Sequence, residues 1–387
     1  MQRKNWSRLA VCMALLAFLA RARDLSAQDA VSSMSAVSPA AAGDATLWRF
    51  AVSGDSRNCG DVVMPAIAAG TVKDGAVFYW HLGDFRAMYA IDEDIAQANG
   101  TKDLKAYQQM AWDDFIERQI VPFGSLPVYL GRGNHDEAGV KTIVDYINKF
   151  ADWLEEPEVR AQRLKDDPAD HTLKTYYHWI ERGVDFVNMD NAGEDQFEPE
   201  QMNWFEAVLE RDASDSSVTT VVVGMHRALP DSITTGHSMN DTPVGTTSGR
   251  RAYADLVEFR RKTGKKVYVL ASHSHFYMTD VYNTACRQLH PDTILPGWIV
   301  GTAGAVRYRL PADHSGAKEA ATDLYGYLLG NVLRDGTIRL EFKQIKREDL
   351  PPGTRQHYPE TLIDQCFKDN SANYIPEGPP QPPNCPE

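Results

Sequence analysis

The chain has 387 residues, a length that suits one large domain or two ordinary ones. Of these residues 43% are hydrophobic and 24% charged, a composition typical of a globular protein. Its formal net charge is −13 at pH 7. Because nucleic-acid binding depends on cationic contacts to phosphates, this acidity argues against a nucleic-acid partner, but a small phosphate ester in a locally positive pocket stays compatible with it.

The N-terminus predicts a secretory signal peptide over residues 1–27. Basic residues precede an apolar run from Leu9 to Ala20, and Leu25-Ser26-Ala27 is suited to cleavage. An uncleaved anchor is the alternative, but the run is shorter than the ~20 residues that a spanning helix needs. We therefore expect a secreted or periplasmic protein with no stable membrane insertion after cleavage.

Four cysteines follow the predicted signal peptide: Cys59, Cys286, Cys366 and Cys385. An even number in an exported chain permits two disulfides, with three possible pairings. We favour Cys366 with Cys385, which would staple the C-terminal tail, and Cys59 with Cys286. Free, buried thiols are the alternative.

The body of the chain alternates strand-like and helix-like stretches. Residues 28–45 are rich in Ala, Ser and Val and predict a flexible lead-in. Helical stripes of apolar residues begin at Leu104, at Met202 shortly after Pro199, and at Tyr253. This alternation indicates an α/β fold. Strands are expected over 47–52, 77–82, 127–130, 219–223 and 266–270.

The pattern changes towards the C-terminus. Asp335-Gly336 between strand-like runs at 325–332 and 337–342 predicts a hairpin, so the sheet should end in antiparallel strands. We place one domain over residues 46–350 and read the Pro-rich residues 351–387 as an extended tail. Polar stretches at 154–174 and 228–249 look like insertions, and the second is a candidate lid.

Polar residues follow nearly every predicted strand, at the position where open α/β sheets usually carry their sites. Carboxylate, amide oxygen and imidazole together suit borderline divalent metals. The sequence therefore predicts a metal-dependent hydrolytic site. Its candidate residues are Asp55, Asp84, Asn134, His135, His226, His273 and His275.

The order and spacing of these motifs resemble the calcineurin-like metallophosphoesterase family over Thr46 to Lys346. The most specific part is Gly133-Asn134-His135-Asp136, followed by a lone His226 and then the His273-x-His275 pair. The resemblance implies a four-layer α/β/β/α sandwich with mixed sheets. It also implies a hydrolase of phosphate esters, either a phosphomonoesterase or a phosphodiesterase, which the predicted signal peptide would make an exported one.

The resemblance assigns roles to the candidate residues. It implies two divalent metal ions, which could be Mn, Fe, Zn or Mg, and a hydroxide shared by the two metals as the nucleophile. His135 would be the general acid beside the leaving group. Asp84 would bridge the metals, with Asn134, His226 and His273 completing one site and Asp55 and His275 the other.

One position departs from the family pattern. Many members have Asp-x-His at the first motif, where this chain has Asp55-Ser56-Arg57. The second metal could bind with more water, could use His81 or Asn58, or could be absent, with the Arg57 guanidinium supplying its charge. A catalytically inactive metal- or phosphate-binding member of the fold is therefore the alternative function.

Arginines accompany most of the proposed ligands. A guanidinium suits bidentate phosphate binding, and our hypothesis is that Arg57 clamps the substrate phosphate. We expect Arg86, Arg132, Arg227, Arg307 and Arg309 to neutralise carboxylates or face solvent. His237, in the candidate lid, could touch substrate. The remaining histidines are expected in surface or loop positions: His171, His178, His290, His314 and His357.

Overall fold

The computed structural model describes residues 45–137, 141–234 and 236–368. The predicted signal peptide, most of the lead-in, Cys385 and the end of the tail lie outside these residues. Among the described residues, every helix is too short or too polar to cross a membrane.

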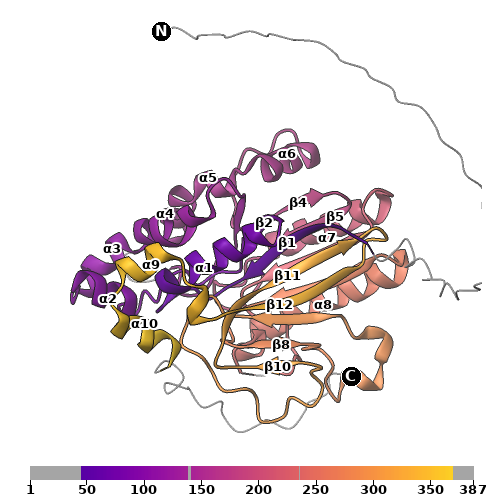
Figure 1. The fold of residues 1–387 in the computed structure, drawn as a ribbon. Coiled ribbons are helices and arrows are strands. Elements are labelled where there is room, and N and C mark those ends of the chain that lie inside the picture. The colour runs from indigo at the N-terminus through magenta and orange to yellow at the C-terminus, as the bar shows by residue number, and fades with distance from the viewer. Residues whose placement is uncertain (1–44, 138–140, 235, 369–387) are drawn as a thin grey trace, which may run out of the picture. The chain divides into compact units, whose positions relative to one another are not determined.

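The first sheet brings together the first strand and the last two strands of the described chain (Figure 1). Its parallel part consists of β1 (Thr46–Ser53), β2 (Ala76–His81) and β3 (Val128–Leu130). The hairpin of β11 (Tyr325–Leu333) and β12 (Ile338–Ile345) joins antiparallel to β1. The resulting order is β12-β11-β1-β2-β3.

The second sheet has the order β10-β8-β9-β7-β6-β5-β4 and is also mixed. Its parallel centre is β5 (Val184–Asn188), β6 (Thr220–Met225), β7 (Lys266–Ala271) and β9 (Gly297–Val300). The antiparallel strands at its edges are β4 (Tyr177–Glu181), β8 (Tyr277–Thr279) and β10 (Ala320–Ala321).

The helices lie between and around these strands (Figure 1). The longer ones are α1 (Gly60–Lys73), α3 (Leu104–Phe115), α6 (Pro157–Asp166), α7 (Pro199–Ser214) and α8 (Pro243–Thr263). The shorter ones are α2 (Glu93–Asn99), α4 (Ile143–Lys149), α5 (Ala151–Leu154), α9 (Pro352–His357) and α10 (Glu360–Phe367).

Alternating side chains of the strands build two cores. Phe50 and Phe78 of the first sheet pack edge-on against Phe186 of the second, with ring centroids 4.9 and 5.0 Å apart. On β6, Val222 belongs to this inter-sheet core, whereas its neighbours Val221 and Val223 face a second core shared with α7 and α8. Successive side chains of a strand point to opposite faces, so both faces of the second sheet are covered.

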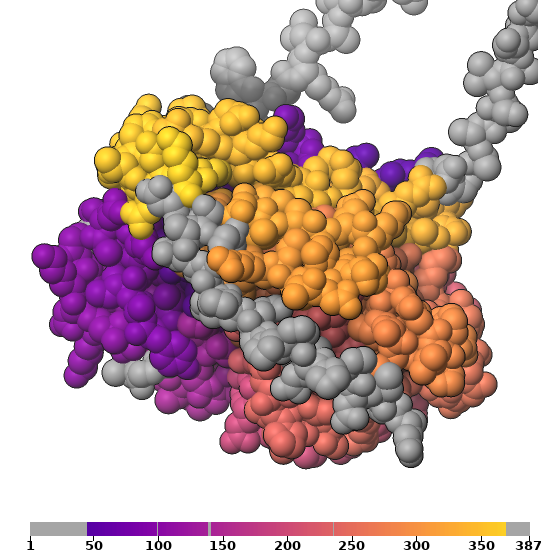
Figure 2. All heavy atoms as spheres, turned by 90° about the horizontal axis from the view of Figure 1, so that it is seen from below, coloured from indigo at the N-terminus to yellow at the C-terminus, as the bar shows by residue number. Residues whose placement is uncertain are grey.

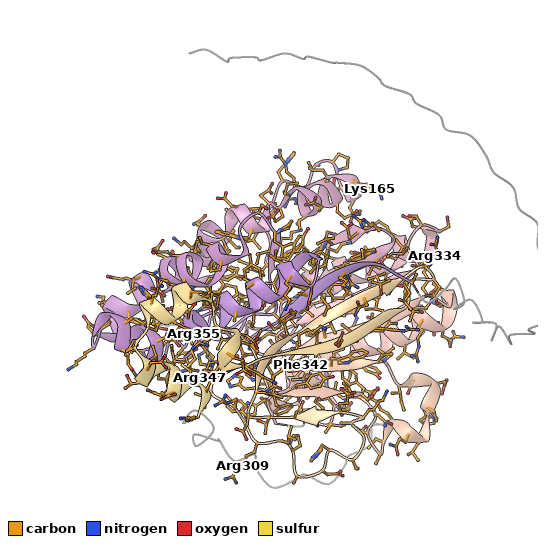
Figure 3. All side chains as sticks on the ribbon, viewed as in Figure 1. Lys165, Arg309, Arg334, Phe342, Arg347 and Arg355 are labelled. Atoms are coloured by element: carbon orange, nitrogen blue, oxygen red, sulfur yellow. A yellow bond between two sulfur atoms is a disulfide. The ribbon has the colours of Figure 1, made fainter. Side chains whose placement is uncertain are left out.

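The α/β fold with mixed sheets is confirmed, as are the five predicted strands and the C-terminal hairpin. The four-layer stacking stays a prediction, which the packing of α7 and α8 on one face and of the first sheet on the other supports. In Figure 3, Phe342 marks β12, where its ring stacks on Tyr277 at 4.5 Å and ties the hairpin to the second sheet.

Two predicted polar segments are more regular than expected. The insertion at 154–174 contains α6, and α8 begins at Pro243, ten residues before the apolar stripe at Tyr253. Thr242 caps α8 by accepting a hydrogen bond from the Gly245 amide, and Pro243 is at the first helical position. The helix start is therefore set by capping chemistry and not by apolar spacing.

The extended tail is wrong for residues 352–367, which form α9 and α10. Pro351 and Pro359 are the N-cap residues of these helices, a position that tolerates proline, so they precede helices and not an extended tail. In Figure 2 this yellow segment lies directly against the purple N-terminal part of the domain. The Tyr358 hydroxyl donates to Asp61 at 3.2 Å, which anchors the segment beside α1.

The favoured disulfide pairing is also wrong. Cys59 is bonded to Cys366, 307 positions further along the chain. Because α10 returns to the start of α1, Cys366 reaches Cys59 directly, an approach that chain spacing alone does not reveal. The predicted partner Cys385 lies outside the described residues.

His178 is not a surface residue as expected. It is buried on β4, where its ring lies 2.7 Å from Asp185 and 2.6 Å from Asp166. The sequence pattern missed this position because the two carboxylates come from β5 and α6.

Candidate metal centre

The candidate residues converge where the carboxyl ends of strands from both sheets meet. Asp55 and Asp84 follow β1 and β2, and Asn134 follows β3 of the same sheet. The histidines come from the second sheet, with His226 after β6 and the His273-x-His275 pair after β7. The predicted convergence is therefore present in the structure.

Left-handed backbone turns aim these side chains. Asp55, Asp84 and His273 have φ values of 62°, 59° and 63°, a conformation that costs a non-glycine residue of order 1–3 kcal/mol. Such strain persists only where surrounding contacts determine the backbone, and it clusters at functional sites.

Asp136 holds two of these loops together. Its carboxylate accepts hydrogen bonds from the amides of Asp84 at 2.8 Å, Phe85 at 2.8 Å and Gly133 at 2.7 Å. The loops also touch directly, because a Cβ on Gly83 would lie 2.4 Å from the Gly133 nitrogen. Only glycine permits this approach.

One group of atoms gathers around His226 Nε2. This nitrogen lies 3.0 Å from Asn134 Oδ1, 3.0 Å from His273 Nδ1 and 3.3 Å from Asp84 Oδ1. The other ring nitrogen of His226 lies 3.0 Å from the Leu82 carbonyl oxygen, to which it donates. In the neutral ring, His226 Nε2 is then an acceptor that faces two further acceptors, the oxygens of Asn134 and Asp84, and a divalent cation would satisfy these lone pairs.

A second group consists of Asp55, Asp84 and His275, whose ligand atoms lie within 4.8 Å of one another. His275 Nδ1 donates to the Val306 carbonyl oxygen, which leaves Nε2 as the acceptor. This Nε2 lies 3.1 Å from Asp55 Oδ1 and equally 3.1 Å from the guanidinium of Arg57. A cation, the Arg57 guanidinium, therefore already contacts this second group of candidate ligands.

The centre is buried and strongly polarised. Although burial alone would raise the pKa of Asp84, the neighbouring His226, His135 and Arg57 hold this pKa well below its usual range. Burial lowers the pKa of His273, and the neighbouring His226 lowers it further. Burial alone would also lower the pKa of His226, but the neighbouring Asp84 raises it, so without metal His226 competes for a proton. A divalent metal would take the place of that proton, because ionised carboxylates and neutral imidazole are the forms that bind metal.

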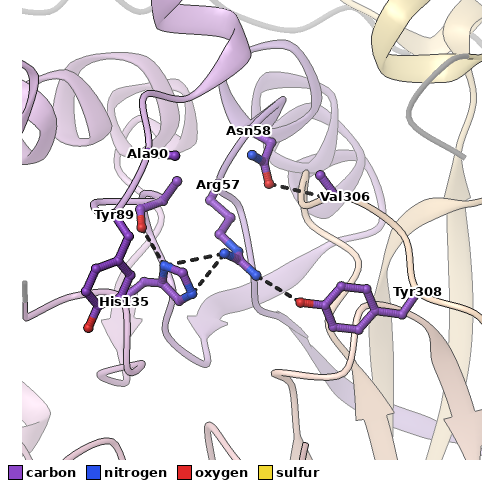
Figure 4. Close-up of a pocket in the computed structure, with 8 residues that line it drawn as sticks. Arg57, Asn58, Tyr89, Ala90, His135, Val306 and Tyr308 are labelled. Carbon is purple, nitrogen blue, oxygen red and sulfur yellow. Dashed lines mark hydrogen bonds between the residues drawn. The ribbon is translucent and has the colours of Figure 1, made fainter. Parts of the chain in front are cut away.

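A cavity of about 250 Å³ lies beside the centre (Figure 4). Arg57, His135 and Tyr308 line it, together with the exposed Tyr89. Arg57 donates to His135 Nε2 at 2.9 Å and to the Tyr308 hydroxyl at 3.2 Å. His135 Nδ1 donates to the Ala87 carbonyl oxygen, so His135 Nε2 is the nitrogen that faces the cavity.

The residues considered as replacements for the missing histidine are used elsewhere. His81 donates from Nε2 to Ser56 at 2.9 Å and accepts the Gly83 amide at Nδ1. Asn58 donates to Glu93 at 2.8 Å and accepts the Val306 amide at 3.2 Å. In this structure neither side chain replaces a ligand.

Arg86 and Arg132 neutralise carboxylates, as expected. Arg86 lies 2.5 Å from Asp61 inside a buried acidic cluster. Arg132 pairs with Asp190 at 2.8 Å.

Arg227 pairs with Asp195 at 2.8 Å. Arg307 is buried and lies over the ring of Tyr325, 4.6 Å from its centroid. This cation–π contact is neither of the two expected outcomes, an ion pair with a carboxylate or exposure to solvent. Arg309 is exposed and projects outward from the molecule (Figure 3).

His237 lies at the rim of the centre, as its place in the candidate lid suggested. Its ring centroid is 5.4 Å from that of His273 and 4.9 Å from that of Tyr308. A contact between His237 and substrate stays a prediction.

Tyr308 is a residue that the sequence reasoning missed. Its ring stacks on His275 with centroids 3.9 Å apart, and its hydroxyl accepts from Arg57. The available signal was its place between Arg307 and Arg309, in the stretch that follows the Gly301–Gly304 loop.

The family model for calcineurin-like phosphoesterases matches residues 49–277, which is more than half of the chain. The chain belongs to this family. Its members are metal-dependent phosphoesterases, in agreement with the buried carboxylates and imidazoles described above.

Solved structures with distant likeness include a structure of PhoD, which is 12% identical, with 80% of this chain and 73% of that chain covered and a TM-score of 0.47. A serine/threonine phosphatase from Saccharomyces cerevisiae with similarity to human phosphatase PP5 is 10% identical, with 77% and 80% covered and a TM-score of 0.26. A cold-active protein-tyrosine phosphatase of a psychrophilic Shewanella is 10% identical, with 76% and 80% covered and a TM-score of 0.25. No curated protein matches the chain.

Proposed function

We propose that this chain is an exported metal-dependent phosphoesterase that hydrolyses small phosphate esters, with monoesters preferred over diesters. The observation that carries the proposal is the buried group of Asp84, His226 and His273 directly beside a cavity lined by Arg57 and His135. A cavity of about 250 Å³ suits a phosphoryl group with a small leaving group better than a polymer.

The atoms around His226 Nε2 fit a divalent metal, held by Asp84, Asn134, His226 and His273. When bound, such a metal supplies Lewis acidity, which activates water as the nucleophile and neutralises charge on the phosphoryl oxygens. Ser272 supports the ligand set, because its hydroxyl and His226 Nδ1 both lie within hydrogen-bonding distance of the Leu82 carbonyl oxygen.

Arg57 and His135 would act on the substrate itself. The Arg57 guanidinium offers N–H groups and a permanent positive charge to the phosphoryl oxygens. His135 donates from Nδ1 to the Ala87 carbonyl oxygen and accepts from Arg57 at Nε2. It would give a proton to the leaving oxygen from the imidazolium form, with Arg57 turned from Nε2 to the phosphoryl oxygens. Tyr308 keeps Arg57 in place through its hydroxyl.

The test is turnover by the purified mature protein after metal removal and addition of Mn²⁺ or Zn²⁺. We expect release of nitrophenol from a nitrophenyl phosphate monoester, with slower release from the bis(nitrophenyl) diester. Asp84→Asn should lower kcat/KM by at least about 100-fold, since a ligand carboxylate is lost. The absence of turnover on both esters with every divalent metal would instead favour a metal- or phosphate-binding protein.

Export is part of the proposal. The buried Cys59–Cys366 disulfide supports it, because such bonds persist in oxidising compartments. N-terminal sequencing of the protein recovered outside the cytoplasm should find cleavage after residue 27. An intact N-terminus on cytoplasmic protein with free thiols would contradict export.

A further inference from the structure

The two groups of candidate ligand atoms differ in whether a donor from the protein already occupies a lone pair that a metal would use. Around His226 Nε2, the amide oxygen of Asn134 and the carboxylate of Asp84 meet as acceptors. In the other group, Arg57 donates its N–H to His275 Nε2 at 3.1 Å. The imidazole lone pair that a metal would use in the second group is therefore already taken.

The guanidinium is also close to the carboxylate shared by both groups. Arg57 Nε lies 3.9 Å from Asp84 Oδ2, an oxygen that accepts no hydrogen bond among the described residues. Arg57 thus stands between Asp84 and His275, which are two of the three members of the second group.

Arg57 is held in this position and is not a freely moving side chain. The Tyr308 hydroxyl accepts from it at 3.2 Å and His135 Nε2 at 2.9 Å (Figure 4). Tyr308 is in turn stacked on His275, so Arg57 and His275 share one rigid support. A guanidinium does not lose its proton in proteins, which makes this a permanent charge.

The net charge of the buried centre favours one bound metal over two. Asp55 and Asp84 contribute two negative charges, and Arg57 contributes one positive charge. One divalent ion leaves a single excess positive charge before water or substrate binds, whereas two divalent ions leave three in a buried centre. Excess buried charge is costly, and a second metal within a few ångströms of Arg57 should bind at least about 100-fold more weakly than the first.

We infer that Arg57 takes the place of a second metal ion, so that the centre binds one divalent metal at Asp84, Asn134, His226 and His273 beside a fixed guanidinium. The second ligand set, with Asp55 and His275, then serves to orient Arg57. This inference rests on the proposed function in that it describes how the same site neutralises a phosphoryl group.

Metal stoichiometry tests the inference independently of turnover. Metal-free protein is titrated with Mn²⁺ in equilibrium dialysis and monitored by electron paramagnetic resonance. The native protein should bind one tight equivalent with the hyperfine spectrum of an isolated ion. Arg57→His should gain a second equivalent and a spin-coupled spectrum, and the matched control Arg118→His, which lies on η1 (Ile116–Ile120) with a partly exposed side chain, should stay at one.

Two equivalents with dissociation constants within tenfold of each other in the native protein would overturn the inference. So would an Arg57→His variant that folds with native circular dichroism and still binds a single ion. If Arg57→His does not fold, the stoichiometry of the native protein alone decides. One bound metal without ester hydrolysis would refute the proposed function and leave this inference standing, whereas hydrolysis with two bound metals would do the reverse.

Discussion

Asp84 shows how single residues set the chemistry of this centre. One of its oxygens accepts the His135 amide at 2.9 Å and lies 3.3 Å from His226, and the other lies 3.9 Å from Arg57. The ionised carboxylate therefore lies between the candidate metal ligands and Arg57, which lines the cavity. Its neighbours therefore decide what the centre binds.

His135 should matter most for substrates whose leaving group needs a proton. We expect His135→Gln to lower kcat by about 100-fold or more on an alkyl phosphate, and by less than about tenfold on nitrophenyl phosphate. The reason is that nitrophenolate leaves without protonation. Steady-state kinetics on both esters measure the difference, with the exposed His314→Gln as the matched control. Equal losses on the two esters would show that His135 does not act as a general acid.

The loops after β2 and β3 form the element on which the centre is built. They are joined by the three amides that Asp136 accepts and by the contact of Gly83 with Gly133. The candidate ligands Asp84 and Asn134 lie on these two loops. Changes that separate the loops should therefore affect stability and metal binding together.

Gly83→Ala tests this loop contact. Its Cβ would meet Gly133 backbone atoms at 2.4 and 2.7 Å, which cannot yield as a side chain would. We expect a loss of about 2–4 kcal/mol in the free energy of unfolding, together with weaker metal binding. The control is Gly264→Ala, which also has positive φ but has open space around it, and should cost only about 1 kcal/mol. If Gly83→Ala and Gly264→Ala lost equal stability and metal binding stayed intact, the two loops would not depend on the contact between Gly83 and Gly133.

His178 gives the contact of β4, β5 and α6 a dependence on pH. Burial alone would lower its pKa, but the carboxylates of Asp185 and Asp166 raise it to about 10. Burial and the neighbouring Asp185 raise the pKa of Asp212 on α7 to about 9. Arg211 also contacts Asp166, at 2.9 Å.

Stability should therefore fall on the alkaline side. The contribution of protonated His178 is fully present below its unfolded pKa of about 6.5 and is lost as the pH rises through about 10. Asp212 adds a loss of folding stability of the same sign up to about pH 9, because it stays protonated in the folded protein while it is ionised in the unfolded chain. Urea unfolding between pH 6.5 and 9.5 should show a decline of at most about 1.4 kcal/mol per pH unit from His178, reduced in His178→Gln. A flat or rising native profile would contradict this.

Element positions near the centre could be predicted because their signals are local. An apolar, β-branched run followed by Asp, Asn or His marks a strand end, and β1, β2, β3, β6 and β7 each carried that pattern. The start of α8 and the helices after Pro351 could not be predicted in this way. The first depends on capping, and the helices form where the C-terminal segment packs against the domain. At the centre, the motifs predicted which candidate ligands would converge, and their metal binding stays a prediction. Tyr308 depends on ring stacking that only the fold creates.

At the scale of the whole molecule, the first sheet and a disulfide close the chain on itself. The hairpin of β11 and β12 pairs with β1, and Cys366 joins Cys59 at the start of α1. The sequence left three pairings of four cysteines open, since spacing does not reveal which ends of the chain meet. This bond lies directly after Arg57 and Asn58, so it also supports the loop that carries Arg57.

Cys59→Ser combined with Cys366→Ser should lower the free energy of unfolding by about 2–5 kcal/mol, because the bond closes a long loop in the unfolded chain. Denaturant unfolding of the variant beside the oxidised native protein measures this. The fold and the metal stoichiometry should survive, since the candidate ligands follow strand ends. An unchanged midpoint would show that the bond does not stabilise the domain.

The central claim is that metal bound at His226 and its neighbours enables phosphoester hydrolysis. The most direct measurement follows nitrophenyl phosphate turnover while metal-free protein is titrated with Mn²⁺, in the native chain and in His226→Ala. We expect activity to rise in parallel with metal binding in the native protein, and His226→Ala to lose both while the exposed His314→Ala loses neither. Turnover that is independent of added metal, or that persists in His226→Ala, would contradict the account.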